Sequence, residues 1–189
     1  MPVPDFSSGE VLTAAAMDKV GLWLIETKDV VTAGTIDFTS VFSSNYSGYR
    51  LIFNYTNVTN AGNMQFQFRD SGGVIASNYL WNWSGQYIAS GVNTFASYSY
   101  QTTVLNPAFM CSAIVGGRTM GTFDIINPEN ATPCSIFGSW NSVQPFTTIT
   151  QANITGNVTH NASVTRTGFR LSTAAGTATG KFSLYGYRN

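Results

Sequence analysis

Residues 68–74 have the sequence FRDSGGV, and the Asp-Ser-Gly-Gly string within it surrounds the nucleophilic serine of many serine proteases. Such a serine needs a base within hydrogen-bond reach, and that base is normally a histidine. The chain has one histidine, His160, in a polar strand-and-turn segment that nothing in the sequence links to Ser71. Asp70 and Ser71 can hydrogen-bond their own backbone, and the two glycines accept positive φ angles. The segment therefore favours a hairpin turn, with Ser71 as a turn residue.

Other catalytic arrangements find little support in the residue types and their spacing. Beyond residue 30 the carboxylates are Asp37, Asp70, Asp124 and Glu129, and no two are close in sequence, so only the fold could assemble a glycosidase pair. No glycine-rich phosphate loop opens a helix. Two cysteines and one histidine argue against a zinc site. We therefore expect no catalytic residue, no metal, no cofactor and no enzymatic activity.

The two cysteines, Cys111 and Cys134, both lie in strand-like runs. Synthesis in the cytosol favours two buried free thiols. A disulfide stays open as the alternative, because it requires only that the two strands be neighbours.

The segment NYLWNWSGQY, residues 78–87, has the pattern of a binding surface. Alternate residues of an extended chain share a face, so Trp81 and Trp83 lie on one side, while Asn82 and Gln86 interleave or flank them. Aromatic faces beside amides suit sugars, because a ring covers the C–H face and the amides meet the hydroxyls. The alternative, favoured because aromatic residues dominate β cores, is that the tryptophans face inward. The candidate glycan- or receptor-binding residues are Trp81, Asn82, Trp83, Gln86 and, in the segment FGSWNS, Trp140.

The elements that must position these residues are strands. The chain of 189 residues fits one domain, and its charged fraction is only 10%, against about 25% in ordinary globular proteins. Thr, Ser, Asn and aromatic residues are abundant, as is typical of all-β proteins. Strands are expected near residues 30–38, 48–56, 63–69, 73–80, 94–104, 109–116, 119–126, 133–140, 146–155, 157–171 and 178–187. Their number and their Gly/Asn turns predict a mainly β protein, a jelly-roll-like antiparallel β-sandwich with a short N-terminal α-helix.

The helix is expected near the start of the chain. Ser7 and Glu10 have the spacing of a capping box, and residues 11–25 are rich in helix-forming Ala, Leu and Met. The apolar stripe of this helix packs either on its own β domain or on other copies in a homotrimer. The residues assigned to the three-helix seam are Leu12, Ala16, Val20 and Trp23. The chain is therefore divided into an acidic anchor and oligomerisation arm at 1–29 and a β-sandwich domain at 30–189.

Charge and hydropathy patterning restrict the partners. The net charge is zero and no basic run exists, so nucleic-acid binding is not expected. No transmembrane segment and no signal peptide are recognised, so no membrane association is expected. Low charge carries a solubility risk that proteins inside a large assembly tolerate better.

Three stretches of the chain carry a family resemblance. The opening PDFSSGEVLTAAAMDKV fits the pattern F-x-x-G-[ED]-V-L-T-A-A-x-[MLF]-[ND], and the closing GKFSLYGYRN fits G-x-[FIV]-x-L-Y-G. The opening pattern is carried by Phe6, Gly9, Glu10, Val11, Leu12, Thr13, Ala14, Ala15, Met17 and Asp18. The middle, YRLIFNYTNV with MQFQFRDSGGVIASNY, has the look of a strand-and-hairpin core. Together these stretches resemble the tail and fibre proteins of tailed bacteriophages.

The resemblance implies a virion protein in which a small β-sandwich sits on an N-terminal helical anchor, often as a trimer, and it supplies no catalytic residue. We therefore expect a bacteriophage virion structural protein, a trimeric short tail fibre or host-adhesion module. The expected partners are further copies of the chain, other virion proteins bound through the arm, and a host surface glycan. The alternatives are a capsid decoration or head-fibre protein without a host ligand, and a carbohydrate-binding, lectin-like module.

Overall fold

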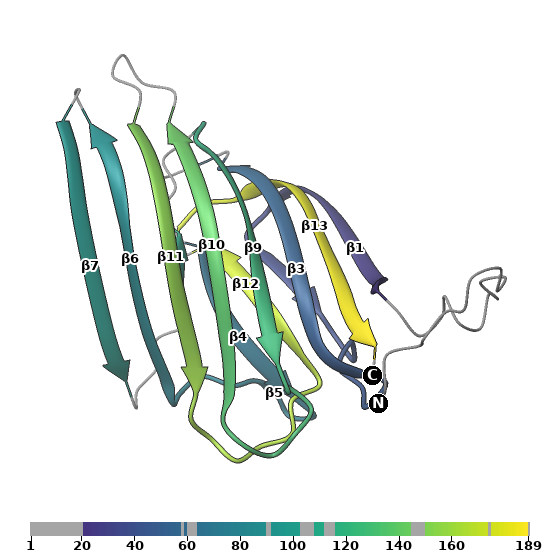
Figure 1. Ribbon diagram of the computed structural model, residues 1–189. Helices are drawn as coiled ribbons and strands as arrows, with labels where there is room; N and C mark the ends of the chain where they lie inside the picture. The colour runs from purple at the N-terminus through teal and green to yellow at the C-terminus, as the bar shows by residue number, and fades with distance from the viewer. Residues whose placement is uncertain are drawn as a thin grey trace, which may run out of the picture.

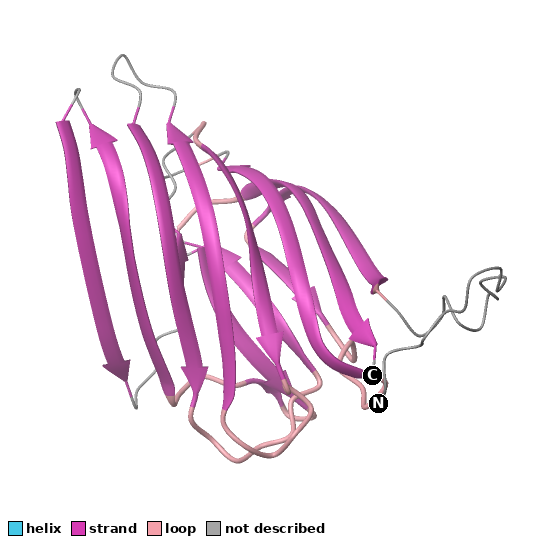
Figure 2. Ribbon diagram, in the orientation of Figure 1, coloured by secondary structure: helices cyan, strands magenta, loops and turns pink. Residues whose placement is uncertain are grey.

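The structure, a computed structural model, describes residues 21–57, 59, 64–89, 92–102, 108–111, 116–144, 150–173 and 175–188. All regular secondary structure in these ranges is β-strand (Figure 2). The strands are β1 (Leu22–Ala33), β2 (Thr35–Phe38), β3 (Tyr46–Asn57), β4 (Met64–Asp70), β5 (Gly73–Val74), β6 (Tyr79–Ala89), β7 (Val92–Thr102), β8 (Ala108–Cys111), β9 (Arg118–Ile126), β10 (Cys134–Gln144), β11 (Thr150–His160), β12 (Gly168–Thr173) and β13 (Ala178–Arg188).

The strands form two antiparallel sheets packed as a sandwich. The larger sheet has eight strands in the order β1-β13-β3-β9-β10-β11-β6-β7. The smaller sheet has the order β2-β12-β4-β5, and β8 also pairs with β4. Figure 1 shows the strands of the larger sheet side by side, with β4, β5 and β12 behind them.

Eight of the strands have the connectivity of a jelly roll. Without β5–β7 and β10–β11, the larger sheet reads β1-β13-β3-β9 and the smaller one β2-β12-β4-β8. Along the chain, each strand of this set lies in the sheet opposite to the strand before it, except that β4 and β8 share the smaller sheet. This is the strand connectivity of a jelly roll, which consists of two Greek keys. The prediction of a mainly β, jelly-roll-like antiparallel sandwich is therefore confirmed. The inserted strands β10, β11, β6 and β7 extend one edge of the larger sheet.

The core lies between the two sheets and consists largely of aromatic rings. On β4, Met64, Phe66 and Phe68 are buried while the residues between them are only partly covered, as the alternation of the sequence predicts. Phe169 of the neighbouring β12 stacks on Phe66 with ring centroids 5.1 Å apart. Each such side chain contributes about 1.5–3 kcal/mol by leaving water, so this layer supplies much of the stability. The largest fully buried apolar side chains are Phe38, Tyr49, Leu51, Tyr55, Phe66, Phe68, Tyr79, Ile125, Phe169 and Phe182.

The N-terminal helix prediction is wrong for residues 22–25, which belong to β1. Trp23 pairs with Gly186 and Leu24 with Tyr185 of β13. The alternation of a half-buried Trp23 and a 59% exposed Leu24 has the period of a strand, and pairing with β13 overrides the local helix preference. The expected boundary between residues 29 and 30 falls inside β1. The earlier part of the predicted helix, with Leu12, Ala16 and Val20, lies outside the described residues.

The Asp-Ser-Gly-Gly segment forms the predicted hairpin turn. Asp70 pairs with Gly73, and an Oδ1 atom of Asp70 accepts a hydrogen bond from the Gly72 N–H at 2.8 Å. Ser71 is exposed at the tip of this turn. Of the two glycines in this turn, Gly73 has the positive φ angle, +128°, and Gly72 does not.

Candidate ligand-binding face of the larger sheet

The pleat of β6 separates the tryptophans from the amides that the sequence grouped together. Trp81 and Trp83 are half-buried and pack against the core, on the inner side of the larger sheet. Asn82 and Gln86 are exposed on its outer side. The structure therefore does not bring these four residues together in one site.

Trp140 belongs to the core. It is 3% exposed on β10, and its ring centroid lies 5.6 Å from that of Phe123 on β9. This position agrees with the inward-facing alternative, and it leaves no face of the indole for a ligand on the surface.

The amides that β6 presents outward lie in register with residues of two neighbouring strands. In the pairing of β10, β11 and β6, one row contains Phe137, Asn157 and Asn82. The next row contains Ser139, Thr155 and Ser84. A third row contains Asn141, Asn153 and Gln86. The side chains of the middle row are small, so the surface of the outer face is recessed along that row.

A hollow of about 410 Å³ lies over the second and third rows. Its outward-facing lining residues are Ser84, Gln86, Ser139, Asn141 and Thr155, and Gly85, Trp140 and Ile154 complete the lining. Because the tryptophan side chain is buried, the polar residues dominate the surface that a ligand would meet.

Among the side chains that the structure describes, Phe137 is an exposed aromatic residue next to this hollow. Half of its surface, 50%, is open to solvent, although it lies between the buried Ile136 and the glycine at 138. Phe137 is not among the candidates predicted from the sequence, because the aromatic residues of β6 are denser and form the stronger pattern. The signal that could have found it is its parity: along β10 it is out of step with Cys134, Ile136 and Trp140, which are all buried.

Charge is confined to one border of this face. No Asp, Glu, Lys or Arg occurs in β10, β11 or β6. On the neighbouring β9, Asp124 accepts two hydrogen bonds from Arg50, at 2.8 and 2.7 Å, and one from the Tyr187 hydroxyl at 2.9 Å. The Arg50 hydrogen bonds hold the pKa of Asp124 below its usual value, so this carboxylate is ionised and already paired.

His160 and Ser71 do not form a catalytic pair. His160 is fully buried, and its Nδ1 atom accepts hydrogen bonds from the Arg166 guanidinium, whereas Ser71 is exposed in the β4–β5 turn. Burial first, and then the positive charge of Arg166, lowers the pKa of His160 to about 4. His160 is therefore a neutral structural residue at pH 7.

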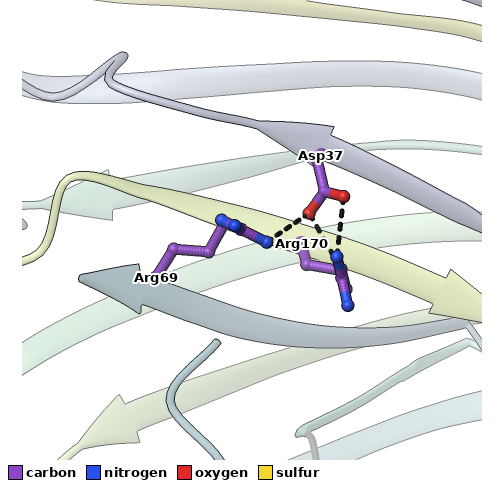
Figure 3. A network of polar contacts seen from close by, with 3 residues as sticks. All are labelled: Asp37, Arg69 and Arg170. Carbon is purple, nitrogen blue, oxygen red and sulfur yellow. Dashed lines mark hydrogen bonds and ion pairs between the residues drawn. The ribbon is translucent and has the colours of Figure 1, made fainter. Parts of the chain in front are cut away.

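A second group of charged residues lies on the outer face of the smaller sheet. Asp37 accepts two hydrogen bonds from Arg170, both at 2.8 Å, and one from Arg69 at 2.8 Å (Figure 3). The Arg170 hydrogen bonds are the main reason that the pKa of Asp37 lies below its usual value. The three residues come from adjacent strands β2, β12 and β4, so the network ties those strands together.

The remaining reactive group is Cys134, a buried free thiol. Its Sγ–H donates to the Ile126 carbonyl at 3.2 Å, and burial raises its pKa to about 12, which keeps it unreactive at neutral pH. The side chain of Cys111 lies outside the described residues. In the described part of the chain there is no cluster of three acidic, histidine or cysteine side chains suited to a metal ion. Nor does that part contain a helix with the length and hydrophobicity to cross a membrane.

Comparisons of the chain with protein-family models, with curated proteins and with solved structures find no match. The resemblance to tail and fibre proteins of tailed bacteriophages therefore stays a prediction.

Proposed function

We propose that the chain is a structural protein of a bacteriophage virion, acting as a short tail fibre or host-adhesion module. The observation that carries this proposal is the jelly-roll connectivity of β1-β13-β3-β9 and β2-β12-β4-β8. Viral structural domains and lectins use this architecture repeatedly. The order of the phage-like segments along the chain adds support, because they occur at its beginning, middle and end.

The outer face of the larger sheet supports a role in an assembly. Apolar side chains that are at least 40% exposed recur on it: Leu22, Leu24, Ile52, Met120, Ile126, Phe137 and Val143. Contacts with neighbouring proteins in an assembly would remove these side chains from water.

The attachment element in this proposal is the segment that precedes β1. Residues 1–20 contain Leu12, Ala16 and Val20, which we assign to the contact between three copies. Trp23 is no longer assigned to this contact, because it lies on β1, where the Arg188 guanidinium is 5.2 Å from the centre of its ring. Trimerisation multiplies any weak surface binding by avidity, as an adhesion protein requires.

Labelling of intact particles tests the proposal. An antibody against the β domain, imaged on virions by electron microscopy, should mark the tail. Label on the capsid would support the decoration alternative instead. Absence of label, together with protein found only outside particles, would overturn a virion role.

A truncation separates the arm from the domain. Deletion of residues 1–20 keeps the whole of β1, which begins at Leu22, so the β-sandwich should fold. The shortened protein should sediment as a monomer and no longer enter particles. Normal incorporation would contradict the assignment of the arm, and a full-length monomer at micromolar concentration would contradict the trimer.

A further inference from the structure

We propose that the outer face of β10, β11 and β6 binds a neutral oligosaccharide, with Phe137 as the stacking residue. The inference rests on the proposed adhesion function and names its ligand class and its site. The site is a trough that runs across the strands. Its floor is Ser139, Thr155 and Ser84, and the row containing Phe137 is the next row along the strands.

The shape of the trough follows from side-chain size. Residues two apart on a strand lie about 7 Å apart on the same face, so the Phe137 ring stands next to the hydroxyl of Ser139. Asn141 and Gln86 line the opposite side of the hollow. Its volume of about 410 Å³ falls within the range of small-molecule sites, which is about 300–1,000 Å³.

The polar groups of the trough are available to a ligand. Among the described residues, no hydrogen bond engages the side chains of Asn82, Ser139 or Asn141, and the Thr155 hydroxyl makes only a 3.5 Å contact with the Ser84 carbonyl. An amide offers donors and acceptors together, and so does a hydroxyl. Sugar hydroxyls have the same dual character, and therefore match such a surface better than a purely acidic or basic ligand would.

The exposed ring supplies the remaining interaction. Phe137 is not needed to fill the core, since half of it faces solvent. A ring in that position can cover the C–H face of a sugar while Asn157 and Asn82, from the same row, meet the hydroxyls at its edge.

The distribution of charge decides between neutral and acidic saccharides. The three strands of the trough carry no Asp, Glu, Lys or Arg, their one histidine, His160, is buried and neutral at pH 7, and Asp124 on the adjacent β9 is paired with Arg50. A second hollow, of about 470 Å³, lies elsewhere on the same sheet and is lined by Lys181, Arg118 and Asp29. An acidic saccharide would favour that hollow, so the two sites predict different ligands and different critical residues.

The test uses the full-length protein and an array of neutral and acidic oligosaccharides from bacterial surfaces. At least one neutral oligosaccharide should bind. The oligosaccharide with the strongest signal on the array should then be titrated into the protein in soluble, monovalent form. Phe137→Ala should weaken this binding at least tenfold, and Asn82→Ala by about threefold or more. Phe137→Tyr, which keeps a ring, should stay within about threefold of the parent.

The matched control is Ile126→Ala, because Ile126 is 40% exposed on the same sheet face but lies outside the trough. It should bind like the parent. The proposal is overturned if no neutral oligosaccharide binds, or if Phe137→Ala and Ile126→Ala behave alike. Preference for acidic oligosaccharides with loss of binding in Arg118→Ala would also overturn it, in favour of the second hollow.

Particle labelling keeps this result separate from the proposed function. Binding by the trough, combined with absence of the protein from virions, would leave the site in place and remove the virion role. A protein located at the tail that binds no neutral oligosaccharide would retain the virion role and remove the site.

Discussion

The Arg166 guanidinium donates to Nδ1 of His160 from two of its nitrogens, with Nε 3.0 Å away and an Nη 2.8 Å away. Its other hydrogen bonds go to the backbone carbonyls of Asn130, Thr132, His160 and Ala162. All five N–H hydrogens of a guanidinium can be satisfied in this way without a carboxylate. A 1% exposed cation thus joins the segment before β10 to the segment before β12.

Acidification should destabilise the protein through His160. The folded pKa of about 4 lies below the ordinary value of 6.5, so the unfolded chain binds a proton that the native state excludes. The contribution of His160 to the free energy of unfolding is therefore fully present above pH 6.5. It decreases as the pH drops toward 4, by up to roughly 3 kcal/mol. Asp37 and Asp124, whose pKa values are lowered, also stabilise the folded state, and their contributions are lost at a lower pH than that of His160. Urea unfolding between pH 7 and pH 4 measures the change.

Proton NMR provides the direct control, because the chain has a single histidine. Its ring resonances should not titrate between pH 7 and pH 5 in the folded protein. A midpoint near 6.5 would contradict the buried, neutral state of His160.

Removal of the buried arginine should cost far more than removal of a surface arginine. Arg166→Met leaves four backbone carbonyls without their donor, and we expect a loss of about 3 kcal/mol or more. Arg170→Met is the matched comparison, since Arg170 is 31% exposed in its pair with Asp37, and it should cost about 1 kcal/mol or less. Denaturant titration of the two variants at pH 7 checks this, and equal losses would argue against the structural role of Arg166.

The sequence predicted the local features of this fold better than the long-range ones. The strand expected near residues 63–69 and the turn at Asp70 depend on neighbouring residues, and both predictions are confirmed. A strand was expected over 157–171, but β11 ends at His160 and β12 begins at Gly168. The interruption depends on Arg166 turning inward to reach Asn130 and Thr132, and sequence periodicity contains no information about contacts across more than 30 residues.

The candidate site was harder to predict for the same reason. Alternation in β6 placed Trp81 and Trp83 on one face, but the prediction still grouped them with Asn82 and Gln86, and the sequence does not show which face the second sheet covers. Phe137, an exposed ring in the same row as Asn82, lies on β10 and is brought there through β11. A site assembled from three strands can be recognised only when their pairing is known.

The β4–β5 turn should respond to substitutions according to backbone angle. Gly73 has a φ of +128°, which a β-branched residue adopts only with strain, so Gly73→Val should cost about 1–3 kcal/mol. Ser71→Ala, at the exposed tip, should change stability by no more than about 0.5 kcal/mol. Thermal melting of both variants measures the difference, and equal, negligible effects would argue against this turn.

Two aromatic residues of β10 should differ in what they contribute, because they lie on opposite faces of one strand. Trp140 is 3% exposed and packs on Phe123, so Trp140→Ala should destabilise the fold by about 3–5 kcal/mol. Phe137 is 50% exposed, and Phe137→Ala should cost about 1 kcal/mol or less, since little apolar surface is removed from the interior. Denaturant titration at pH 7 compares the two variants directly. A large loss in Phe137→Ala would mean that this ring supports the fold and is not free to stack on a sugar, whereas a small loss in Trp140→Ala would contradict its place in the core.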